Sequence, residues 1–173
     1  MASRRDMIRM DPEEITTFLG GRRTLNIASF GPDGNIHLVA MWYGFLDSSN
    51  VFDPSVGFAG PTPTTGGEIV IETFGKSQKV MNFRRNQRFT AIVEAGDEYS
   101  ELQGVELVGT VSILEDEPTV IESCKAVLSR YQDLPKPEDL QFAAEFAARK
   151  RVCVKMHVDK IVSWDHGKLD VQY

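Results

Sequence analysis

The chain has 173 residues, of which 42% are hydrophobic and 25% charged, and its net charge is −6 at pH 7. This length fits one domain with a buried core, and the acidic balance argues against general binding to nucleic acid, which needs a cationic face. No apolar run is long enough to span a membrane, and none follows Arg4 and Arg5 as it would in a secretory signal. Cys124, Cys153 and the three histidines are scattered, so we expect reduced thiols in a cytoplasmic protein and no metal site.

The N-terminal part of the chain predicts one helix and a β-hairpin. Asp11 is a good N-cap residue, Pro12 fits the first helical position, and acids fill the first turn, so a short helix should run to Gly20-Gly21. Strands are expected at residues 24–30 and 36–46, joined by a Gly-Pro-Asp-Gly-Asn turn.

Residues 47–67 show no hydrophobic periodicity and are dense in Ser, Pro, Thr and Gly. A loop of this length without secondary structure is unusual inside a compact domain. We therefore expect a loop insertion that is either a functional lid or disordered.

The remaining chain predicts further strands and helices in irregular alternation. Strands are expected at residues 68–74, 88–95, 105–114 and 151–164, the last with a change of face near His157, and helices at residues 76–86, 118–131 and 138–150. Six strands linked mostly by tight turns, without repeated strand–helix–strand units, predict a mainly β fold. The expected architecture is a closed antiparallel barrel with peripheral helices, forming one domain over residues 1–173.

The start of the helix expected at 76–86 is the most informative stretch for function. Lys76 and Lys79 are three residues apart, so they would be neighbours in the first turn, where cations oppose the helix dipole. An anion at the helix N-terminus would remove this conflict, because backbone N–H groups, the Ser77 hydroxyl and two ammonium groups would converge on it. A phosphate fits these donors best; the alternative is a solvated basic surface helix.

Other well-known motifs are missing or incomplete. Gly75-Lys76-Ser77 resembles the end of a phosphate-binding P-loop, but Val70 stands where that motif needs a glycine. No Gly-x-Gly-x-x-Gly, His-Glu-x-x-His or Gly-x-Ser-x-Gly sequence occurs. Nucleoside triphosphatase and Rossmann dinucleotide sites are therefore disfavoured.

The strand expected at residues 36–46 is apolar almost continuously from Leu38 to Trp42. An antiparallel strand with one wet face should alternate, so a partner subunit, a planar ligand or both should cover the second face. Trp42 is a candidate for the wall of a cofactor pocket; the alternative is a core or dimer-interface aromatic.

The segment Lys79-x-x-Asn82-Phe83-Arg84-Arg85-Asn86-Gln87-Arg88, which follows Thr73-x-Gly75, resembles the cofactor-phosphate segment of pyridoxamine 5′-phosphate oxidase-like split-barrel flavoproteins. These include proteins that use FMN and proteins that use the deazaflavin coenzyme F-420. The similarity extends from the opening helix to Ser163-Trp164-Asp165-His166-Gly167-Lys168-Leu169, and the Asn-Phe-Arg-Arg run is closer to the deazaflavin branch.

This resemblance implies a six-stranded split barrel that works as a homodimer, with FMN or F-420 at the subunit interface. Lys79 would hold the cofactor phosphate, and Trp164 and Lys168 resemble tail residues that reach the partner's active site. The ring and ribityl chain would be lined, largely through backbone groups, by His37, Leu38, Val39, Ala40, Met41 and Trp42. The other implied cofactor-binding residues are Glu72, Thr73, Lys76, Ser77, Gln78 and Asn82.

Three departures from the pyridoxamine phosphate oxidases matter. Gln78 replaces an arginine before the phosphate lysine, and the tail ends at Tyr173 with Lys168 where those oxidases carry arginine. Pyridoxamine phosphate is therefore not the expected substrate. The insertion at 47–67 replaces a short turn, and our hypothesis is that it covers the substrate side of the ring.

The resulting expectation is an oxidoreductase that transfers hydride between its cofactor and a small unsaturated or heteroaromatic molecule, without nucleic-acid or membrane partners. The protein's task is then to bind and orient the cofactor, so no catalytic acid or base is assigned, although His37 and Tyr43 lie on the relevant strand. The alternatives are a cofactor carrier or redox sensor without turnover, and a cofactor-free barrel dimer.

Overall fold

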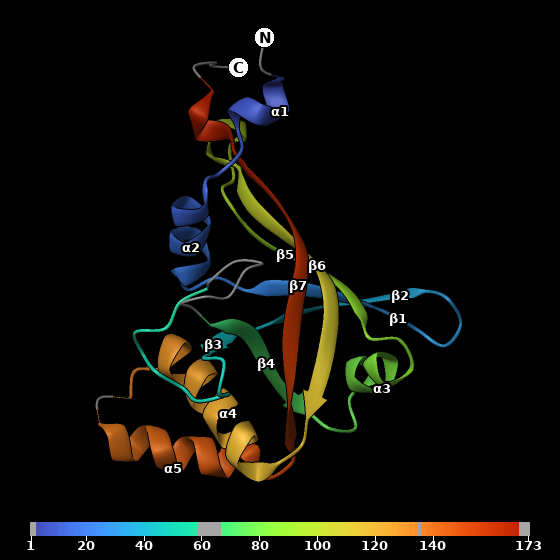
Figure 1. Ribbon diagram of the computed structural model, residues 1–173, viewed down its shortest axis with the longest axis vertical. Coiled ribbons are helices and arrows are strands. Elements are labelled where there is room, and N and C mark those ends of the chain that lie inside the picture. The colour runs from blue at the N-terminus through green and yellow to red at the C-terminus, as the bar shows by residue number, and fades with distance from the viewer. Residues whose placement is uncertain (1–2, 59–66, 135, 170–173) are drawn as a thin grey trace.

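A computed structural model describes residues 3–58, 67–134 and 136–169. Its seven strands form one antiparallel sheet that curls into a half-barrel, with helices packed around it (Figure 1). The strands are β1 (Leu25–Phe30), β2 (Ile36–Met41), β3 (Gly44–Leu46), β4 (Glu68–Phe74), β5 (Arg88–Ala95), β6 (Gln103–Leu114) and β7 (Arg151–Asp165). The helices are α1 (Arg4–Met7), α2 (Pro12–Gly20), α3 (Gln78–Arg85), α4 (Glu117–Tyr131) and α5 (Pro137–Ala148), with 3-10 turns η1 (Tyr99–Glu101) and η2 (His166–Lys168).

The local sequence signals account for most element boundaries. The Asp11 side chain caps α2 by accepting from the Glu14 backbone N–H at 2.9 Å, and Gly21 ends the helix. The predicted bounds of β4 and β5 are confirmed, and α4 and α5 begin one residue before their predicted starts, each with proline in its first turn. The mainly β prediction with peripheral helices is confirmed.

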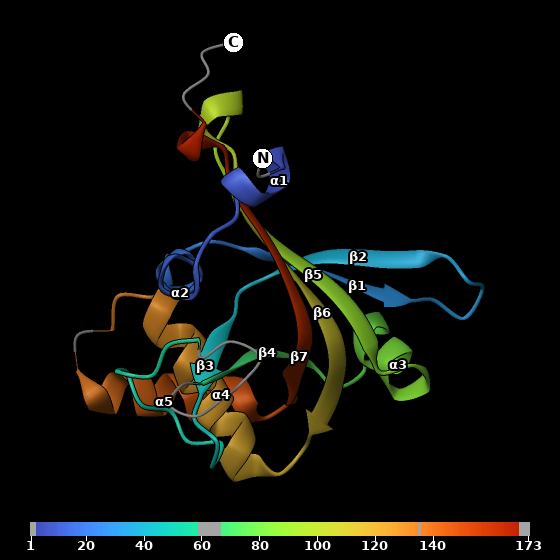
Figure 2. The same ribbon diagram turned by 45° about the horizontal axis from the view of Figure 1, so that its top comes forward.

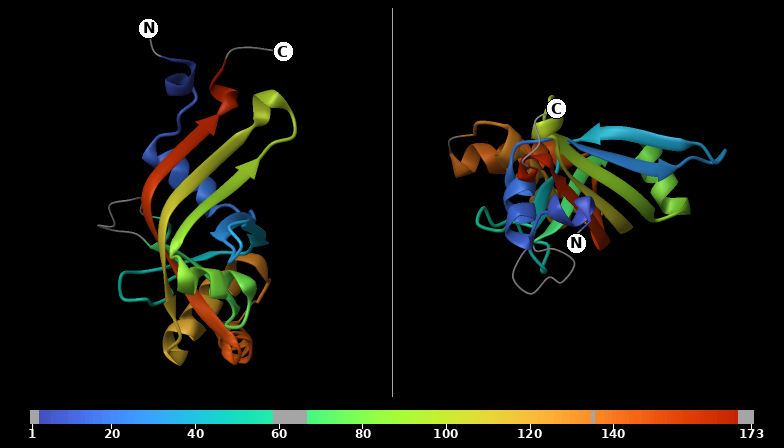
Figure 3. Two further views of the ribbon diagram at one scale, coloured as in Figure 1. Left: turned by 90° about the vertical axis from the view of Figure 1, so that its right-hand side faces the viewer. Right: turned by 90° about the horizontal axis from the view of Figure 1, so that it is seen from above.

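The sheet order is β2-β1-β5-β6-β7-β4-β3, so β2 and β3, which are adjacent in sequence, lie at opposite edges. β5, β6 and β7 form a long ribbon that rises from the helices to the end where α1 and η2 lie, while the β1–β2 hairpin projects to the side (Figures 1 and 2). The curl of the sheet is clear in Figure 3. Within the described residues the two edge strands do not pair with each other, so the expected closed barrel is instead open on one side.

The prediction of one strand over residues 36–46 is wrong, and this is why seven strands replace the expected six. The chain turns at Trp42 and Tyr43: the Trp42 ring stacks on Tyr131 with centroids 4.8 Å apart, and the buried Tyr43 hydroxyl donates to the Leu19 carbonyl at 2.8 Å. Gly44 then lies against α4, where a Cβ atom would be 2.5 Å from a backbone carbon of Ala126. These contacts send β3 to the far edge of the sheet.

The prediction that the helix after β4 begins at Lys76 is also wrong. Ser77 is the N-cap residue and α3 begins at Gln78, so Lys79 is in the first turn but Lys76 precedes the helix. Serine adopts the extended N-cap conformation readily, so the chain enters the helix after residue 77 rather than before it.

The main hydrophobic core fills the concave side of the sheet and includes the buried Ile69, Ile71, Val154 and Met156. α4 covers part of the outer face, where Ala126 packs with Val70 and Cys153. α5 packs on α4 around Cys124 and Ala144. None of the helices in the described ranges is long and apolar enough to cross a membrane.

Candidate functional site

The end of β4 and the start of α3 bring a lysine into a nearly buried polar position. The Lys79 side chain is on the first turn of α3 and only 9% of the residue is exposed. Its Nζ donates to Thr73 Oγ1 at 3.0 Å, and the Ser77 hydroxyl lies 3.5 Å from the same oxygen. Three side chains from one strand–turn–helix unit therefore converge, whereas Lys76, which is expected from the sequence to join Lys79, is exposed.

The Lys79 ammonium lies in an environment that does not favour its charge. Burial lowers its pKa, and the Glu72 carboxylate opposes this shift only in part. A bound anion would favour the charged form and return the pKa toward its ordinary value. The electrostatics at Lys79 therefore favour the binding of an anion.

The N-terminus of α3 points to the same chemistry. The Ser77 side chain makes no capping hydrogen bond to the helix. The first backbone N–H groups of an α-helix have no partner inside the helix, and their dipoles favour negative charge. A phosphate placed here would accept from these groups and from Lys79 together.

A second polar cluster continues along the buried side of α3 to the β1–β2 hairpin. The fully buried Asn82 donates from Nδ2 to Ser29 Oγ at 3.0 Å and accepts from Gln78 Nε2 at 2.8 Å. Ser29 is the register partner of His37, and the buried His37 Nδ1 has no hydrogen-bond partner among the described residues. An unsatisfied buried nitrogen is costly, so this face also has hydrogen-bonding capacity for a ligand.

A cavity of about 420 Å³ opens beside this unit, in the gap between β2 and β4. That volume is in the range of small-molecule sites. Because β2 is an edge strand, its outer backbone groups are available to a ligand. The cavity is lined by Thr24, Ala40, Met41, Trp42, Glu72, Thr73, Phe74 and Arg151.

Glu72 and Arg151 form an ion pair on the wall of this cavity. Burial raises the pKa of Glu72, while Arg151 and then Lys79 act in the opposite direction. The Arg151 guanidinium also lies 5.2 Å from the centre of the Phe74 ring. The wall thus combines a buried carboxylate with a guanidinium that lies over an aromatic ring. The carboxylate is already paired with that guanidinium.

The structure brings about half of the predicted cofactor residues together at this cavity. Ala40, Met41, Trp42, Glu72 and Thr73 line the cavity, and Lys79 contacts Thr73. The remaining predicted residues differ in where they lie. Ser77, Gln78 and Asn82 lie at α3, Val39 packs against the core, and Lys76 and Leu38 are exposed.

Trp164 and Lys168 lie at the other end of the β5–β7 ribbon from α3 (Figure 1). Lys168 forms an ion pair with Glu14 of its own chain and donates to the Arg9 carbonyl at 2.9 Å. The Trp164 ring packs on Gly104 so closely that a Cβ atom there would overlap it. Within one subunit these two residues do not join the cavity.

The predicted loop insertion is described at residues 47–58 and 67; residues 59–66 lie outside the described part. The Phe52 backbone N–H donates to the Glu122 carboxylate on α4 at 3.0 Å. Phe58 is buried and its carbonyl accepts from Thr16 on α2 at 3.1 Å. This part of the loop therefore packs on helices, and its role as a lid stays a prediction.

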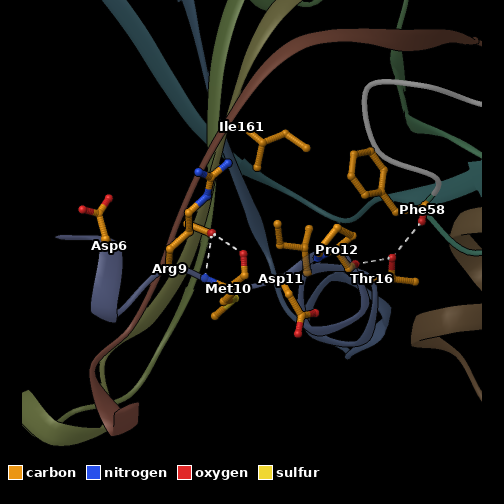
Figure 4. A pocket seen from close by; sticks show the side chains of 10 residues that line it. Asp6, Arg9, Met10, Asp11, Pro12, Thr16, Phe58 and Ile161 are labelled. Carbon is orange, nitrogen blue, oxygen red and sulfur yellow. Dashed lines mark hydrogen bonds between the residues drawn. The ribbon is translucent and has the colours of Figure 1, made fainter. Parts of the chain in front are cut away.

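A separate cavity of about 610 Å³ lies between the α1–α2 bend and β7 (Figure 4). Asp6 and Phe58 mark its opposite ends. At its wall, the Met10 backbone N–H donates to Ser163 Oγ at 3.2 Å. None of the residues lining it is a predicted cofactor residue.

Sequence reasoning missed three residues that line the cavity between β2 and β4, namely Thr24, Phe74 and Arg151. Thr24 immediately precedes β1, Phe74 ends β4 and Arg151 begins β7, while Tyr131 supports Trp42 from the end of α4. None belongs to a motif, since strand pairing alone brings Arg151 beside Phe74. The described residues contain no group of three or more His, Cys, Asp or Glu side chains suited to a metal ion.

Comparison with known proteins gives a consistent picture. A family model described as pyridoxamine 5′-phosphate oxidase matches residues 11–165. The crystal structure of a conserved hypothetical protein from Mycobacterium tuberculosis has a TM-score of 0.81 and 34% sequence identity, covering 99% of this chain and 95% of that chain. No curated protein matches the sequence.

Two more distant structures share the fold. An F-420 reductase has a TM-score of 0.53 and 19% identity, covering 84% of this chain and 93% of that one. A heme storage protein from Vibrio cholerae has a TM-score of 0.58 and 10% identity, covering 90% and 96%. At these identities the likeness is one of fold.

Proposed function

The chain belongs to the pyridoxamine 5′-phosphate oxidase family, and from this premise we propose that it is an FMN- or F-420-dependent oxidoreductase acting on a small organic molecule. The observation that carries the proposal is the buried Lys79 ammonium at the uncapped start of α3, beside a cavity of about 420 Å³. FMN and F-420 share a tricyclic ring and a ribityl phosphate. The start of α3 suits the phosphate, and the cavity suits the ring.

The phosphate belongs at the strand–turn–helix unit. Lys79 and Ser77 would bind it with the first N–H groups of α3, while Thr73 holds the lysine in position. His37 would offer its unpaired Nδ1 from the hairpin side. A dianion here offsets the cost of burying the Lys79 charge, so ligand binding and local stability are coupled.

The ring belongs in the cavity between β2 and β4. The free edge of β2 at Ala40 and Met41 presents backbone groups to a planar ligand, and Trp42 forms an aromatic wall supported by Tyr131. Glu72 and Arg151 fix the opposite wall. A flavin or deazaflavin bound here supplies hydride transfer, and the chain's own residues orient the ring and exclude water.

A homodimer is part of the proposal. The outer face of the β1–β2 hairpin exposes Phe30, Ile36 and Leu38 at 43%, 58% and 63%, next to the half-exposed Trp42. Such a contiguous apolar face is typical of an interface. In the dimer Trp164 and Lys168 would reach the partner's cofactor only if Lys168 leaves Glu14. A molar mass of one subunit in light scattering would contradict this part.

We place the protein in the cytoplasm. Cys124 and Cys153 are free and buried, and burial raises the pKa of each to about 12. Thiols of this kind are unreactive and suit a reducing compartment.

A carrier or redox sensor is the second candidate, and the state of the polar groups at the site favours it. Glu72 is paired with Arg151, and the Tyr43 hydroxyl, whose pKa burial raises to about 12, donates to a carbonyl. Neither group is poised to move a proton to a substrate. A carrier needs only the binding features.

The deciding experiment is an absorbance spectrum of the purified protein, followed by titration with FMN and with F-420. We expect one of them to bind with a dissociation constant below 10 µM or so, a typical affinity for a specific small-molecule site. Reoxidation of the reduced bound cofactor by nitro- or enone-type acceptors faster than in free solution identifies an oxidoreductase. Binding without acceleration supports the carrier, and failure to bind either cofactor contradicts both.

A further inference from the structure

A second cluster of polar side chains lies on the outer face of the sheet, at the strands beside the loop insertion. We call Glu68, Ser112, Lys155 and His157 the outer-face cluster. Their sequence neighbours Ile69, Val111, Ile113, Val154 and Met156 belong to the main core, so the cluster residues point to the opposite face. None of them lines the cavity between β2 and β4.

The outer-face cluster contains a continuous hydrogen-bonded chain from a serine to a carboxylate. Ser112 Oγ is 2.8 Å from His157 Nε2, and His157 Nδ1 is 2.8 Å from Glu68 Oε1. The other Glu68 oxygen pairs with the Lys155 ammonium. With Nδ1–H donating to the carboxylate, Nε2 is the acceptor for the serine hydroxyl, which is the arrangement that activates a serine nucleophile.

The ion pair with Lys155 holds the Glu68 carboxylate in place for its hydrogen bond to His157. Lys155 is only 7% exposed, and its Nζ also donates to Asn50 Oδ1 at 2.8 Å. The pair with Lys155 fixes the position of the Glu68 carboxylate, which in turn orients the imidazole through its hydrogen bond to Nδ1. His157 itself is 40% exposed, so a small molecule has access to it.

Asn50 is linked to the outer-face cluster through Lys155. The Lys155 Nζ donates to Asn50 Oδ1 at 2.8 Å, and Lys155 is the register partner of Ser112 across β6 and β7. The Asn50 backbone has φ 63°, a left-handed conformation uncommon outside glycine. Since its Oδ1 accepts from Lys155, its amide Nδ2 remains available, and a side-chain amide is a known donor to a developing oxyanion.

We propose that Ser112, His157 and Glu68 form a second catalytic site, which hydrolyses small esters by acyl transfer. Ser112 Oγ attacks the carbonyl carbon while its proton passes to His157 Nε2. The ester C–O bond breaks, and the alcohol leaves with that proton. Water then attacks the acyl-serine, gives its proton to Nε2, and releases the carboxylic acid as Ser112 recovers its hydrogen.

The test uses the full chain, without added cofactor, and two probes: a fluorophosphonate for covalent labelling and p-nitrophenyl acetate for turnover. We expect one adduct per chain, mapped by peptide mass spectrometry to Ser112. Ser112→Ala should remove the adduct. His157→Gln should slow labelling and hydrolysis by roughly 100-fold or more, since a general base contributes about 10²–10⁴ in rate.

Ser129→Ala and His166→Gln are the matched controls, because both residues make hydrogen bonds to backbone carbonyls elsewhere and lie outside the cluster. Both should label at the wild-type rate. No adduct at Ser112 in the wild-type chain overturns the proposal, as does equal labelling in His157→Gln. A melting curve for each variant separates lost chemistry from lost folding, and the wild-type labelling result needs no variant.

Discussion

The start of α3 and the C-terminal end of β7 are both implicated in cofactor binding by family resemblance, yet they differ in how far their polar groups are satisfied. At α3, Lys79 is buried with its pKa lowered, and the helix start is uncapped. At the other end, Lys168 is paired with Glu14, and the Asp165 carboxylate accepts from the Gly167 N–H at 2.9 Å.

The difference teaches which region is built to receive a ligand. A polar group left without a full set of partners costs stability unless something binds it, whereas a surface pair that is already complete gains little from a ligand. By this criterion we propose the α3 start as the binding site within one subunit. The C-terminal end becomes one only if an assembly rearranges it.

The largest effect on the comparison should come from Asn82→Ala. This change leaves the buried Ser29 hydroxyl without its donor and Gln78 without its acceptor. We expect a loss of about 1–3 kcal/mol in the free energy of unfolding, which is the cost of one unsatisfied buried group, since water can satisfy the exposed Gln78. Urea denaturation measures it. Asn86→Ala, at the exit of the same helix, is the control, and equal losses in the two variants would show that the buried cluster has no special role.

A smaller effect concerns Glu72 and pH. Its pKa in the folded protein is raised, chiefly by burial, so the fold favours the protonated form. The resulting stability is present below the unfolded-state pKa and is lost as pH rises through the folded-state pKa. We therefore expect wild type to lose stability relative to Glu72→Gln as the pH rises from 4.5, the ordinary pKa of a glutamate, through the raised pKa of the folded protein. Thermal melts across that range would contradict the account if the two proteins changed in parallel.

The smallest effect should come from Lys168→Ala. Its ion pair with Glu14 is partly exposed, and such pairs contribute about 0.2–1 kcal/mol to stability. We expect cofactor affinity to stay within about twofold of wild type, because the ammonium is occupied in its own chain. A loss of tenfold or more in a titration would show that Lys168 reaches the partner's cofactor in the dimer.

Local sequence signals were sufficient for the elements whose boundaries depend on local chemistry. The cap at Asp11 fixes α2, a continuous apolar run marks β4, and alternating apolar residues mark β5. The placement of Lys79 in the first turn of the helix after β4 also followed from sequence, whereas its hydrogen bond to Thr73 came from the structure. Ser77 is also a favourable N-cap residue. The prediction gave more weight to Lys76 and Lys79 and therefore began the helix at residue 76.

Features that depend on strand register could not be predicted. The break at Trp42 and Tyr43 arises from contacts with Tyr131 and Leu19, far away in the chain. Ser112 and His157 are 45 residues apart, and only the pairing of β6 with β7 joins them. A change of face near His157 was visible in the sequence, but its partners were not.

The central claim is that the buried Lys79 ammonium holds a cofactor phosphate. Fluorescence titration of FMN or F-420 into the Lys79→Ala variant tests it most directly. The matched control is Lys160→Ala, which changes an exposed lysine of β7. We expect the first variant to lose about 1.5–3 kcal/mol of binding free energy, the range for a charge-assisted hydrogen bond, and the control to bind like wild type. Equal affinity of both variants for the cofactor would contradict the account.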